Sequence, residues 1–367
     1  MRQLKSLYFY WEGTVMKQPT VTSFFLGANS KNGFYSLYDY FASAPDDSLH
    51  IIKSGPGTGK STFMKRIGKA AEERGYDVEY ILCSGDPDSL DGVYIPALHT
   101  GFVDGTSPHV LEPEFFGVSG DYVNLGRFCN TELLKPHHSE IKAATLGYQQ
   151  CYQKAYTYLN AAGTLQSSPE KYKPDEETEL KIRKRAQAKI TRELSGSTHT
   201  PSSPTKRFLR AISCKGNYFL DETIETLCSH LCVLESHFGL EALFFDEILT
   251  VIAQQQVPCI ICPNPLCPDL IEAVLLPEQG LCFIASNTVP EFAGKVRIIH
   301  LDAYLDDIRK NEYKQREKLI QQLIDSAYIH LIQAKVLHDE LETYYRPALD
   351  VDALNAYTEA VIVQLFS

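Results

Sequence analysis

The fold is decided by a short apolar run that leads straight into a glycine-rich turn and then a helical pattern: Leu49-His50-Ile51-Ile52-Lys53-Ser54-Gly55-Pro56-Gly57-Thr58-Gly59-Lys60-Ser61-Thr62. Residues 49–53 predict a β-strand, and residues 60–74 predict a helix. Gly75 tolerates the left-handed conformation in which helices commonly end, and residues 76–83 predict the next strand. The pattern GxxxxGK[ST] therefore stands between a strand and a helix, which is the context of a phosphate-binding loop.

The chemistry of this loop follows from its residue types. Glycines allow backbone amides to converge on phosphate oxygens, and the N-terminus of the following helix adds partial positive charge. We expect Lys60 to reach the β- and γ-phosphates of a nucleoside triphosphate, and the Ser61 hydroxyl to ligate Mg²⁺. ATP and Mg²⁺ are therefore the predicted cofactors. The residues predicted to hold the nucleotide are Gly55, Pro56, Gly57, Thr58, Gly59, Lys60, Ser61 and Thr62.

A phosphate loop also needs an acid that holds Mg²⁺ through water, normally at the end of a neighbouring strand. Asp104, which ends the run Gly101-Phe102-Val103-Asp104, is the candidate. The alternative for this residue is a turn-forming aspartate before Gly105. We predict Ser61 and Asp104 as the metal-binding pair, and Lys60, Asp104 and Asp86 as catalytic residues.

Other polar residues are expected at the same edge of the sheet, where ligands of open α/β sheets collect. Asp86 or Asp88 could position a nucleophile or recognise an acceptor, although Asp-Pro-Asp followed by Ser89 is also a common turn and helix-cap sequence. His109 is either a proton carrier or substrate ligand, or a histidine that satisfies a local hydrogen bond. Arg127 is either a γ-phosphate ligand or a member of a surface ion pair.

The two halves of the chain resemble each other. At a constant spacing of 183 residues, Phe25, Leu26, Ala28, Ser30, Gly33, Tyr35 and Leu37 reappear as Phe208, Leu209, Ala211, Ser213, Gly216, Tyr218 and Leu220. Further on, Pro87-Asp88 is repeated as Pro268-Asp269, and Tyr172-Lys173-Pro174 finds a counterpart in Tyr345-Arg346-Pro347. Each half alternates strands with helices, which predicts a parallel sheet flanked by helices.

We therefore predict an α/β protein with two tandem P-loop NTPase-like parallel-sheet domains and long helical extensions. The predicted parts are an N-terminal extension (1–19), an active P-loop domain (20–165), a helical segment and linker (166–206), and a degenerate P-loop-like domain with long C-terminal helices (207–367). Within the extension we expect the natural start at Met16, because the codons of Trp11-Glu12-Gly13 resemble a ribosome-binding sequence.

The second half has lost the chemistry of the loop. At a spacing of 181 residues Lys60 is replaced by Glu241, Ser61 by Ala242 and Asp104 by Ala285. A carboxylate in place of the lysine would repel a triphosphate, and alanine cannot ligate Mg²⁺. We predict that the second half binds no nucleotide and covers, orients or regulates the first.

Length and charge limit the classes of protein that fit. The 367 residues, of which 44% are hydrophobic, suffice for two domains with separate cores. The net charge of −11 opposes a phosphate backbone, so we expect no general nucleic-acid binding. No apolar run approaches the roughly 20 residues that a membrane helix needs, so we expect no membrane partner.

Ten cysteines, several of them within apolar runs, predict reduced and buried thiols and hence a cytoplasmic protein. Cys259, Cys262 and Cys267, with Cys282 nearby, have a spacing that also invites a metal site. Residues three apart in a buried strand face opposite sides, so we expect these thiols to lie in the core instead.

From Thr20 onward the chain resembles an uncharacterised bacterial family of tandem P-loop ATPases, in which each half normally carries its own GxPGTGKST loop. The segments that carry the resemblance are 55–62, 83–91, Ile95-Pro96 and 104–109. The resemblance implies ATP binding at Lys60, Ser61 and Thr62. The second loop departs from the family pattern, which leaves one expected nucleotide site.

Three functions fit these observations. The first is a Mg²⁺-dependent ATPase that uses its cycle to change the relation of its two halves. The second is a small-molecule or nucleotide kinase whose acceptor lies beside residues 84–91. The third is a non-catalytic switch gated by the nucleotide. The sequence has no apolar strand that ends in Asp-Glu, whose glutamate would polarise an attacking water, and this absence favours the kinase or the switch.

Overall fold

The computed structural model of the chain describes residues 9–11, 14–16, 18–167, 174–196, 200–285, 292–305 and 310–367. The chain forms two compact units. Unit 1 comprises Met1–Phe24, Phe41–Gln150 and Gln333–Ser367, and unit 2 comprises Phe25–Tyr40 and Cys151–Ile332. The units follow the predicted segments 20–165 and 207–367 only in part, because the end of the chain belongs to unit 1 and the first repeated motif to unit 2.

Some sequence-based expectations fall on residues that the structure does not describe. These are the start of the chain as far as residue 8, Glu12-Gly13 beside the expected start, residues 172–173 of the repeated Tyr-x-Pro segment, and 197–199 of the linker. Of the N-terminal extension, two short paired strands are described: β1 (Phe9–Trp11) and β2 (Thr14–Met16).

Unit 1 is built on a six-stranded sheet. Its strands, in order across the sheet, are β10 (Gly120–Asn124), β6 (Ser48–Lys53), β9 (Thr100–Asp104), β8 (Leu90–Ile95), β7 (Val78–Leu82) and β3 (Val21–Phe24). β6 pairs in parallel with both β9 and β10, and β3 in parallel with β7. The predicted strands at 49–53, 76–83 and 101–104 are confirmed as β6, β7 and β9.

The prediction of a parallel sheet is wrong for one strand, because β8 is antiparallel to both β7 and β9. The physical reason lies in the connections. Only residues 83–89 separate β7 from β8, and only 96–99 separate β8 from β9. A parallel crossover needs about a dozen residues or more, whereas a short turn suffices to join antiparallel strands. The reversal brings the first residues of β8 to the edge at which β6 and β9 end.

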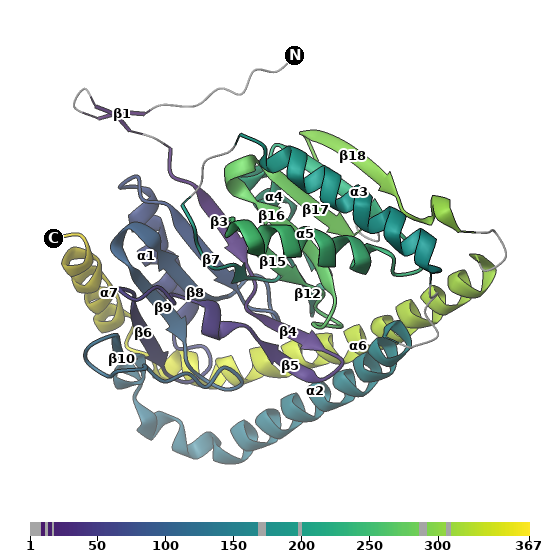
Figure 1. Ribbon diagram of the computed structural model, residues 1–367. Coiled ribbons are helices and arrows are strands. Elements are labelled where there is room, and N and C mark those ends of the chain that lie inside the picture. Colours follow the sequence, from purple (N-terminus) through teal and green to yellow (C-terminus); the bar gives the residue numbers. More distant parts are fainter. Residues whose placement is uncertain are drawn as a thin grey trace. The chain divides into compact units, whose positions relative to one another are not determined.

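Two helices from opposite ends of the chain share the core of unit 1. α1 (Lys60–Glu72) follows β6, and α7 (Val351–Leu365) packs against it, as Figure 1 shows. The rings of Phe63 and Tyr357 are stacked with their centroids 6.2 Å apart. Arg66 of α1 also donates to Asn355 of α7 at 2.6 Å. The last helix of the chain therefore completes the hydrophobic core beneath the glycine-rich loop.

Unit 2 repeats the sheet of unit 1. Its strands, listed in the same direction as those of unit 1, are β18 (Lys295–His300), β14 (His230–Glu235), β17 (Leu281–Ala285), β16 (Ile271–Leu276), β15 (Ile260–Pro263) and β11 (Thr205–Lys206). β16 is antiparallel to its neighbours, and the other pairings are parallel. Order and directions match unit 1 strand for strand, so the internal repeat seen in the sequence is also a repeat of topology. Each unit is α/β with a six-stranded mixed sheet flanked by helices.

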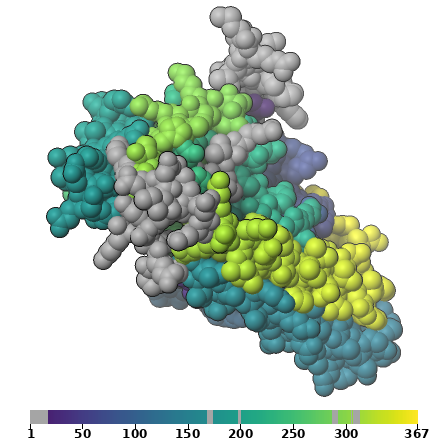
Figure 2. All heavy atoms as spheres, turned by 90° about the vertical axis from the view of Figure 1, so that its right-hand side faces the viewer, coloured from purple at the N-terminus to yellow at the C-terminus, as the bar shows by residue number. Residues whose placement is uncertain are grey.

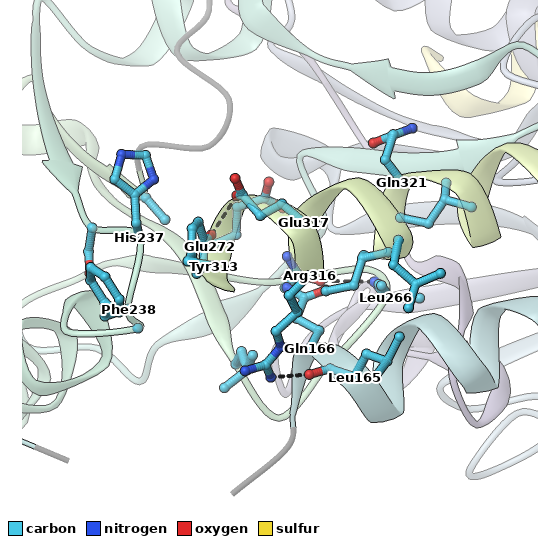
Figure 3. A pocket seen from close by; sticks show the side chains of 18 of the residues that line it. Leu165, Gln166, His237, Phe238, Leu266, Glu272, Tyr313, Arg316, Glu317 and Gln321 are labelled. Atoms are coloured by element: carbon cyan, nitrogen blue, oxygen red, sulfur yellow. Dashed lines mark hydrogen bonds between the residues drawn. The ribbon is translucent and has the colours of Figure 1, made fainter. Parts of the chain in front are cut away.

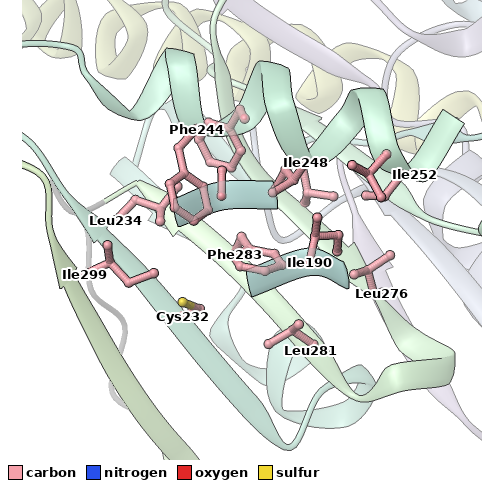
Figure 4. Packing of buried hydrophobic residues seen from close by; sticks show 14 of the residues in the cluster. Ile190, Cys232, Leu234, Phe244, Ile248, Ile252, Leu276, Leu281, Phe283 and Ile299 are labelled. Atoms are coloured by element: carbon pink, nitrogen blue, oxygen red, sulfur yellow. The ribbon is translucent and has the colours of Figure 1, made fainter. Parts of the chain in front are cut away.

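The core of unit 2 is completed by a helix that precedes its sheet in the sequence. α5 (Glu241–Gln255) follows β14, and α3 (Glu176–Leu194) packs on it; α4 (Asp221–Leu227) precedes β14. Figure 4 shows Ile190 of α3 beside Ile248 of α5 over Phe283 of β17. α3 precedes the second copy of the repeated motif, which begins at Phe208. It contributes to the second sheet as α7 contributes to the first.

Both copies of the repeated Phe-Leu motif lie in unit 2, where they form paired hairpins. These are β4 (Gly27–Ser30) with β5 (Gly33–Ser36), and β12 (Arg210–Ser213) with β13 (Gly216–Phe219). Phe25 and Phe208 exchange backbone hydrogen bonds of 2.9 and 2.8 Å. The Asn29 amide donates to the carbonyl of Ile212, 183 residues away, at 2.8 Å. Equivalent residues of the two copies thus contact each other.

Two long helices pass through both units, α2 (His138–Gln166) and α6 (Lys310–Tyr345). In unit 2 Leu159 of α2 and Leu331 of α6 share one buried cluster, and in unit 1 the rings of Tyr148 and His338 lie 5.7 Å apart. Figure 2 shows the two helices side by side, α2 in teal and α6 in yellow. Apolar residues that recur at near-helical spacing from Asp302 to about Tyr345 predict a long helix, or two. The structure has a 3₁₀ segment at Asp302–Tyr304 and then α6 from Lys310 to Tyr345.

Short 3₁₀ segments complete the described secondary structure: Tyr38–Tyr40, Pro96–Leu98, Leu125–Phe128, Thr131–Leu133, Lys135–His137, Pro277–Gln279, Asp302–Tyr304 and Arg346–Ala348. In the part of the chain that the structure describes, no helix has both the length and the apolar content needed to cross a bilayer.

Candidate functional site

The glycine-rich loop joins the end of β6 to the first residue of α1. Gly57 and Gly59 have φ angles of +64° and +87°, in the left-handed region that favours glycine. The Lys60 ammonium folds back over the loop, donates to the Gly55 carbonyl at 2.8 Å and lies 3.6 Å from Asp104 Oδ2. The lysine and aspartate side chains are only 13% and 12% exposed. The Lys60 ammonium is therefore largely buried at the start of α1, with one carbonyl and one carboxylate as its partners.

Two hydroxyl groups anchor the loop. Thr58 is 1% exposed, and its Oγ1 lies 2.6 Å from Ser54 Oγ and 2.7 Å from the Gly55 carbonyl. Ser61 Oγ accepts a 2.9 Å hydrogen bond from the backbone N–H of Leu90 in β8. Because this oxygen keeps a second lone pair, the contact leaves Ser61 capable of ligating a cation.

The two carboxylate oxygens of Asp104 have different partners. β9 pairs directly with β6, with Asp104 opposite Ile52, and this register brings the carboxylate beside the loop. Oδ1 accepts from the Thr106 N–H at 2.9 Å and from its hydroxyl at 2.6 Å, which is an Asx turn, and Oδ2 faces Lys60. The two sequence-based alternatives for this residue are therefore compatible.

A second buried acid lies at the same edge of the sheet. His109 Nε2 is 3.2 Å from Asp91 Oδ2, and both side chains are 8% exposed. Burial lowers the pKa of His109, but the nearby carboxylates of Asp91 and Asp104 outweigh burial and the opposing charge of Lys60, so the pKa is raised. The sequence placed His109 at this edge and Asp91 in the acceptor segment 84–91, without pairing the two. The missing signal was the reversed direction of β8, which carries Asp91 to the strand ends.

The remaining sequence candidates have contacts of their own. Asp86 accepts hydrogen bonds within its turn from the Asp88 N–H at 3.3 Å and from Ser89 at 3.2 Å, and lies 3.5 Å from the Lys335 ammonium of α6. Arg127 stacks on the ring of Tyr357, 4.3 Å from its centroid. Asp86 therefore stabilises its own turn, and Arg127 packs against Tyr357 of α7.

The C-terminal end of α6 packs on the loop, which sequence reasoning missed. A Cβ built on Gly57 would lie 2.9 Å from Cβ of Glu342, and one on Gly55 would lie 2.8 Å from the ring of Tyr345. Glu342 accepts from Arg346 at 2.5 Å and lies 3.6 Å from His338 Nδ1. The absence of side chains at these glycines thus has a packing reason.

His338 adds to the electrostatics of this contact. Burial lowers its pKa, and the charges of Lys335 and Lys60 lower it further against the opposing effect of Glu342 and Asp339. The imidazole is therefore neutral near neutral pH. No local motif in the sequence links residues 333–346 to the loop, because the contact depends on the last part of the chain belonging to unit 1.

In unit 2 the equivalent positions carry different chemistry. α5 starts at Glu241, as α1 starts at Lys60, and β17 ends at Ala285, as β9 ends at Asp104. The matching strand order makes these positions structurally equivalent as well as equivalent in sequence.

The remaining candidates are the cysteines of unit 2 and the possible metal ligands. Cys259, Cys262, Cys267 and Cys282 are buried thiols, and burial raises the pKa of Cys262 and Cys282 well above the usual range. Within the described ranges, no three or more histidine, cysteine, aspartate or glutamate side chains are grouped as they would be around a metal ion. Mg²⁺ in a phosphate loop needs less, because phosphate oxygens and waters supply most of its ligands. Ser61 and Asp104 fit that donor set.

Comparison with models of known protein families, with curated proteins and with solved structures finds no match for this chain.

Proposed function

We propose that unit 1 binds Mg²⁺-ATP at residues 55–62 and hydrolyses the γ-phosphate bond. The observation that carries this proposal is the approach of the Lys60 ammonium to Asp104 Oδ2, 3.6 Å apart, at the ends of two adjacent parallel strands. A triphosphate that enters the loop replaces the Gly55 carbonyl and the carboxylate as the partner of the lysine. Asp104 is then available to hold a magnesium-bound water, and Ser61 to ligate the ion.

The end of α6 supplies the groups that the loop lacks. The sequence has no apolar strand that ends in Asp-Glu, but the backbone of Glu342 lies against Gly57, in the middle of the loop. Its carboxylate would orient the attacking water, and the Arg346 guanidinium that it holds would neutralise charge on the transferred phosphoryl group. This contact favours hydrolysis over the non-catalytic switch.

The second candidate is a kinase, and the Asp91–His109 pair favours it. The pair is buried at the strand ends, and the charge of Lys60 influences His109. A raised pKa makes the imidazolium form more abundant, so His109 would act by binding an anionic acceptor and not by removing its proton.

Phosphate release by the purified chain separates these functions. We expect slow release with ATP and Mg²⁺ that needs no acceptor and falls by roughly 100-fold or more in Lys60→Ala. Lys69→Ala is the matched control, because Lys69 lies on the same helix with its side chain 75% exposed. Release that requires one member of an acceptor panel would support the kinase, and binding without release the switch. Failure to bind any nucleoside triphosphate would overturn the proposal.

A further inference from the structure

Unit 2 contains a cavity of about 950 Å³. Small-molecule sites commonly measure about 300–1,000 Å³. Its floor is formed by residues that follow β14, by Glu241 at the start of α5 and by Glu272 near the start of β16. The first turns of α6, from Tyr313 to Ile324, form another wall (Figure 3). The cavity therefore lies at the strand ends of the second sheet, the edge at which ligands of α/β sheets bind.

This position is the counterpart of the phosphate loop. β14 and α5 of unit 2 correspond to β6 and α1 of unit 1, and the cavity opens between them. The repeat has thus kept a ligand-sized space at the equivalent place while losing the lysine and the hydroxyl. The chemistry of the lining indicates what the space now accepts.

The innermost charges disfavour an anion. Glu241 occupies the first position of α5 and already complements the positive end of the helix dipole. Glu272 is 3% exposed and accepts from Arg210 Nε at 2.7 Å, while another nitrogen of Arg210 donates to Asn217 at 3.0 Å. Burying such a pair costs desolvation energy and adds little stability by itself. Its place in a cavity wall is more readily explained by recognition of a charged group.

Aromatic rings line the same space. The ring of Tyr313 lies 5.3 Å from that of His237 and 5.5 Å from that of Phe238, and its hydroxyl donates to Glu317 at 2.5 Å. Figure 3 shows the three rings on one side of the cavity and Glu272 and Glu317 beside them. Aromatic faces next to carboxylates attract organic cations, through the ring quadrupole and direct ion pairing.

The rest of the wall is mixed. Three basic side chains of α6 also line the space, but Lys314 and Lys318 are exposed, and the Arg316 guanidinium donates to the Leu165 carbonyl. Amide side chains line it too: Gln166, Asn264, Gln315 and Gln321. Aliphatic side chains from the hairpin, the β15–β16 turn and α6 face the space: Ile212, Leu266, Leu270, Ile271, Ile320 and Ile324. A ligand that fills the cavity must therefore carry an apolar body as well as its charged group, because a fully hydrated ion would leave these surfaces uncovered.

We propose that unit 2 binds a small organic cation, an amine on an apolar or aromatic body, in the cavity that replaces the second phosphate loop. The site is independent of nucleotide binding in unit 1, since all residues that form it belong to unit 2. It gives the degenerate half a ligand of its own.

The test is calorimetric titration of the full-length chain with three probes of nearly equal shape: benzylammonium, benzyl alcohol and benzoate. We expect benzylammonium to bind at least about tenfold more tightly than either of the others, which corresponds to about 1.4 kcal/mol. Equal affinity for the three probes, preference for benzoate, or absence of binding by all three would overturn the proposal.

Two variants and one control place the binding in the cavity. Glu272→Gln should abolish the preference for the cation. Since this change leaves Arg210 without its carboxylate, Tyr313→Ala is the second variant, and it should weaken benzylammonium binding at least tenfold while the Arg210–Glu272 pair stays intact. Glu278→Gln, at an exposed glutamate of the Pro277–Gln279 segment, should change nothing. Unchanged affinity in folded Tyr313→Ala would contradict the assignment.

Discussion

Lys60 donates to the Gly55 carbonyl and faces Asp104, so the charge that a triphosphate would meet is already partly balanced within the chain. A buried ammonium without such partners would cost several kcal/mol. Under the proposed function, these contacts would be exchanged for phosphate oxygens when a triphosphate enters. The strength of binding would then depend on how well the loop amides and Mg²⁺ offset the partners that Lys60 loses.

Asp104→Asn tests whether the Asp104 carboxylate contributes to Mg²⁺ binding. The amide oxygen can still accept from Thr106, so the turn should survive, but the carboxylate that faces Lys60 is lost. We expect the affinity for Mg²⁺-ATP to fall by about 10–100-fold, as for other residues that orient a metal site, with little change for ATP without Mg²⁺. Titration with and without Mg²⁺ measures this, and Asp86→Asn serves as the control. An equal loss in both titrations would contradict a metal role.

The Asp91–His109 pair predicts a pH dependence of stability. Burial opposes the charged imidazole, but Asp91 and Asp104 raise the pKa of His109 overall. A raised pKa in the folded state contributes stability that is complete below the ordinary value of about 6.5 and is lost as the pH rises through the folded value. The free energy of unfolding should therefore fall from slightly acid to alkaline pH more steeply in the natural chain than in His109→Gln.

Urea unfolding followed by circular dichroism over a pH series checks this slope. His138→Gln provides the control, because His138 is an exposed residue at the start of α2. The same slope in the natural chain and in His109→Gln would show that the pair does not couple protonation to folding.

Among the elements of unit 1, the C-terminal end of α6 is in close contact with the glycine-rich loop. Gly57→Ala adds a methyl group 2.9 Å from Cβ of Glu342 and 3.1 Å from its backbone, at a φ of +64°. Gly117 has a φ of +77° with nothing within 4 Å, so Gly117→Ala carries the backbone strain alone. We expect Gly57→Ala to cost at least about 1 kcal/mol more than this control, because the helix backbone must shift.

Thermal unfolding of the two alanine variants gives the comparison. Equal destabilisation would mean that α6 is not in close contact with the loop.

The sequence predicts an element best where its signals are local. The strand–loop–helix around residues 49–74 was predictable because its signals are local, whereas the direction of β8 depended on the length of its turns and the approach of Glu342 depended on contacts between residues nearly 300 apart.

Across the whole chain, the two repeats exchange helices. α7 follows the second repeat in the sequence but packs in unit 1, and α3 precedes Phe208 of the second repeat but packs in unit 2. The repeat and the number of sheets were predictable from recurring residues such as Phe25 and Phe208. The exchange of segments could not be predicted. Tyr345-Arg346-Pro347 resembles Tyr172-Lys173-Pro174 in sequence, and this resemblance does not depend on which sheet the following helix packs against.

This exchange predicts that the N-terminal half does not work alone. A fragment of residues 1–206 contains the glycine-rich loop but lacks 333–367, so Phe63 loses its contact with Tyr357 and the loop loses Glu342. We expect the fragment to lack a cooperative thermal transition and to bind no nucleotide. Adding the missing segment back through a linker after residue 150 should restore both. A bare fragment that binds Mg²⁺-ATP as tightly as the full chain would contradict the exchange.

If unit 1 holds Mg²⁺-ATP through Lys60 and unit 2 holds none, calorimetric titration of the full chain with ATP and Mg²⁺ will show it. We predict one nucleotide per chain, lost in Lys60→Ala and retained in Glu241→Ala, which changes the equivalent position of unit 2. No heat of binding with ATP or GTP, or unchanged binding in folded Lys60→Ala, would contradict it.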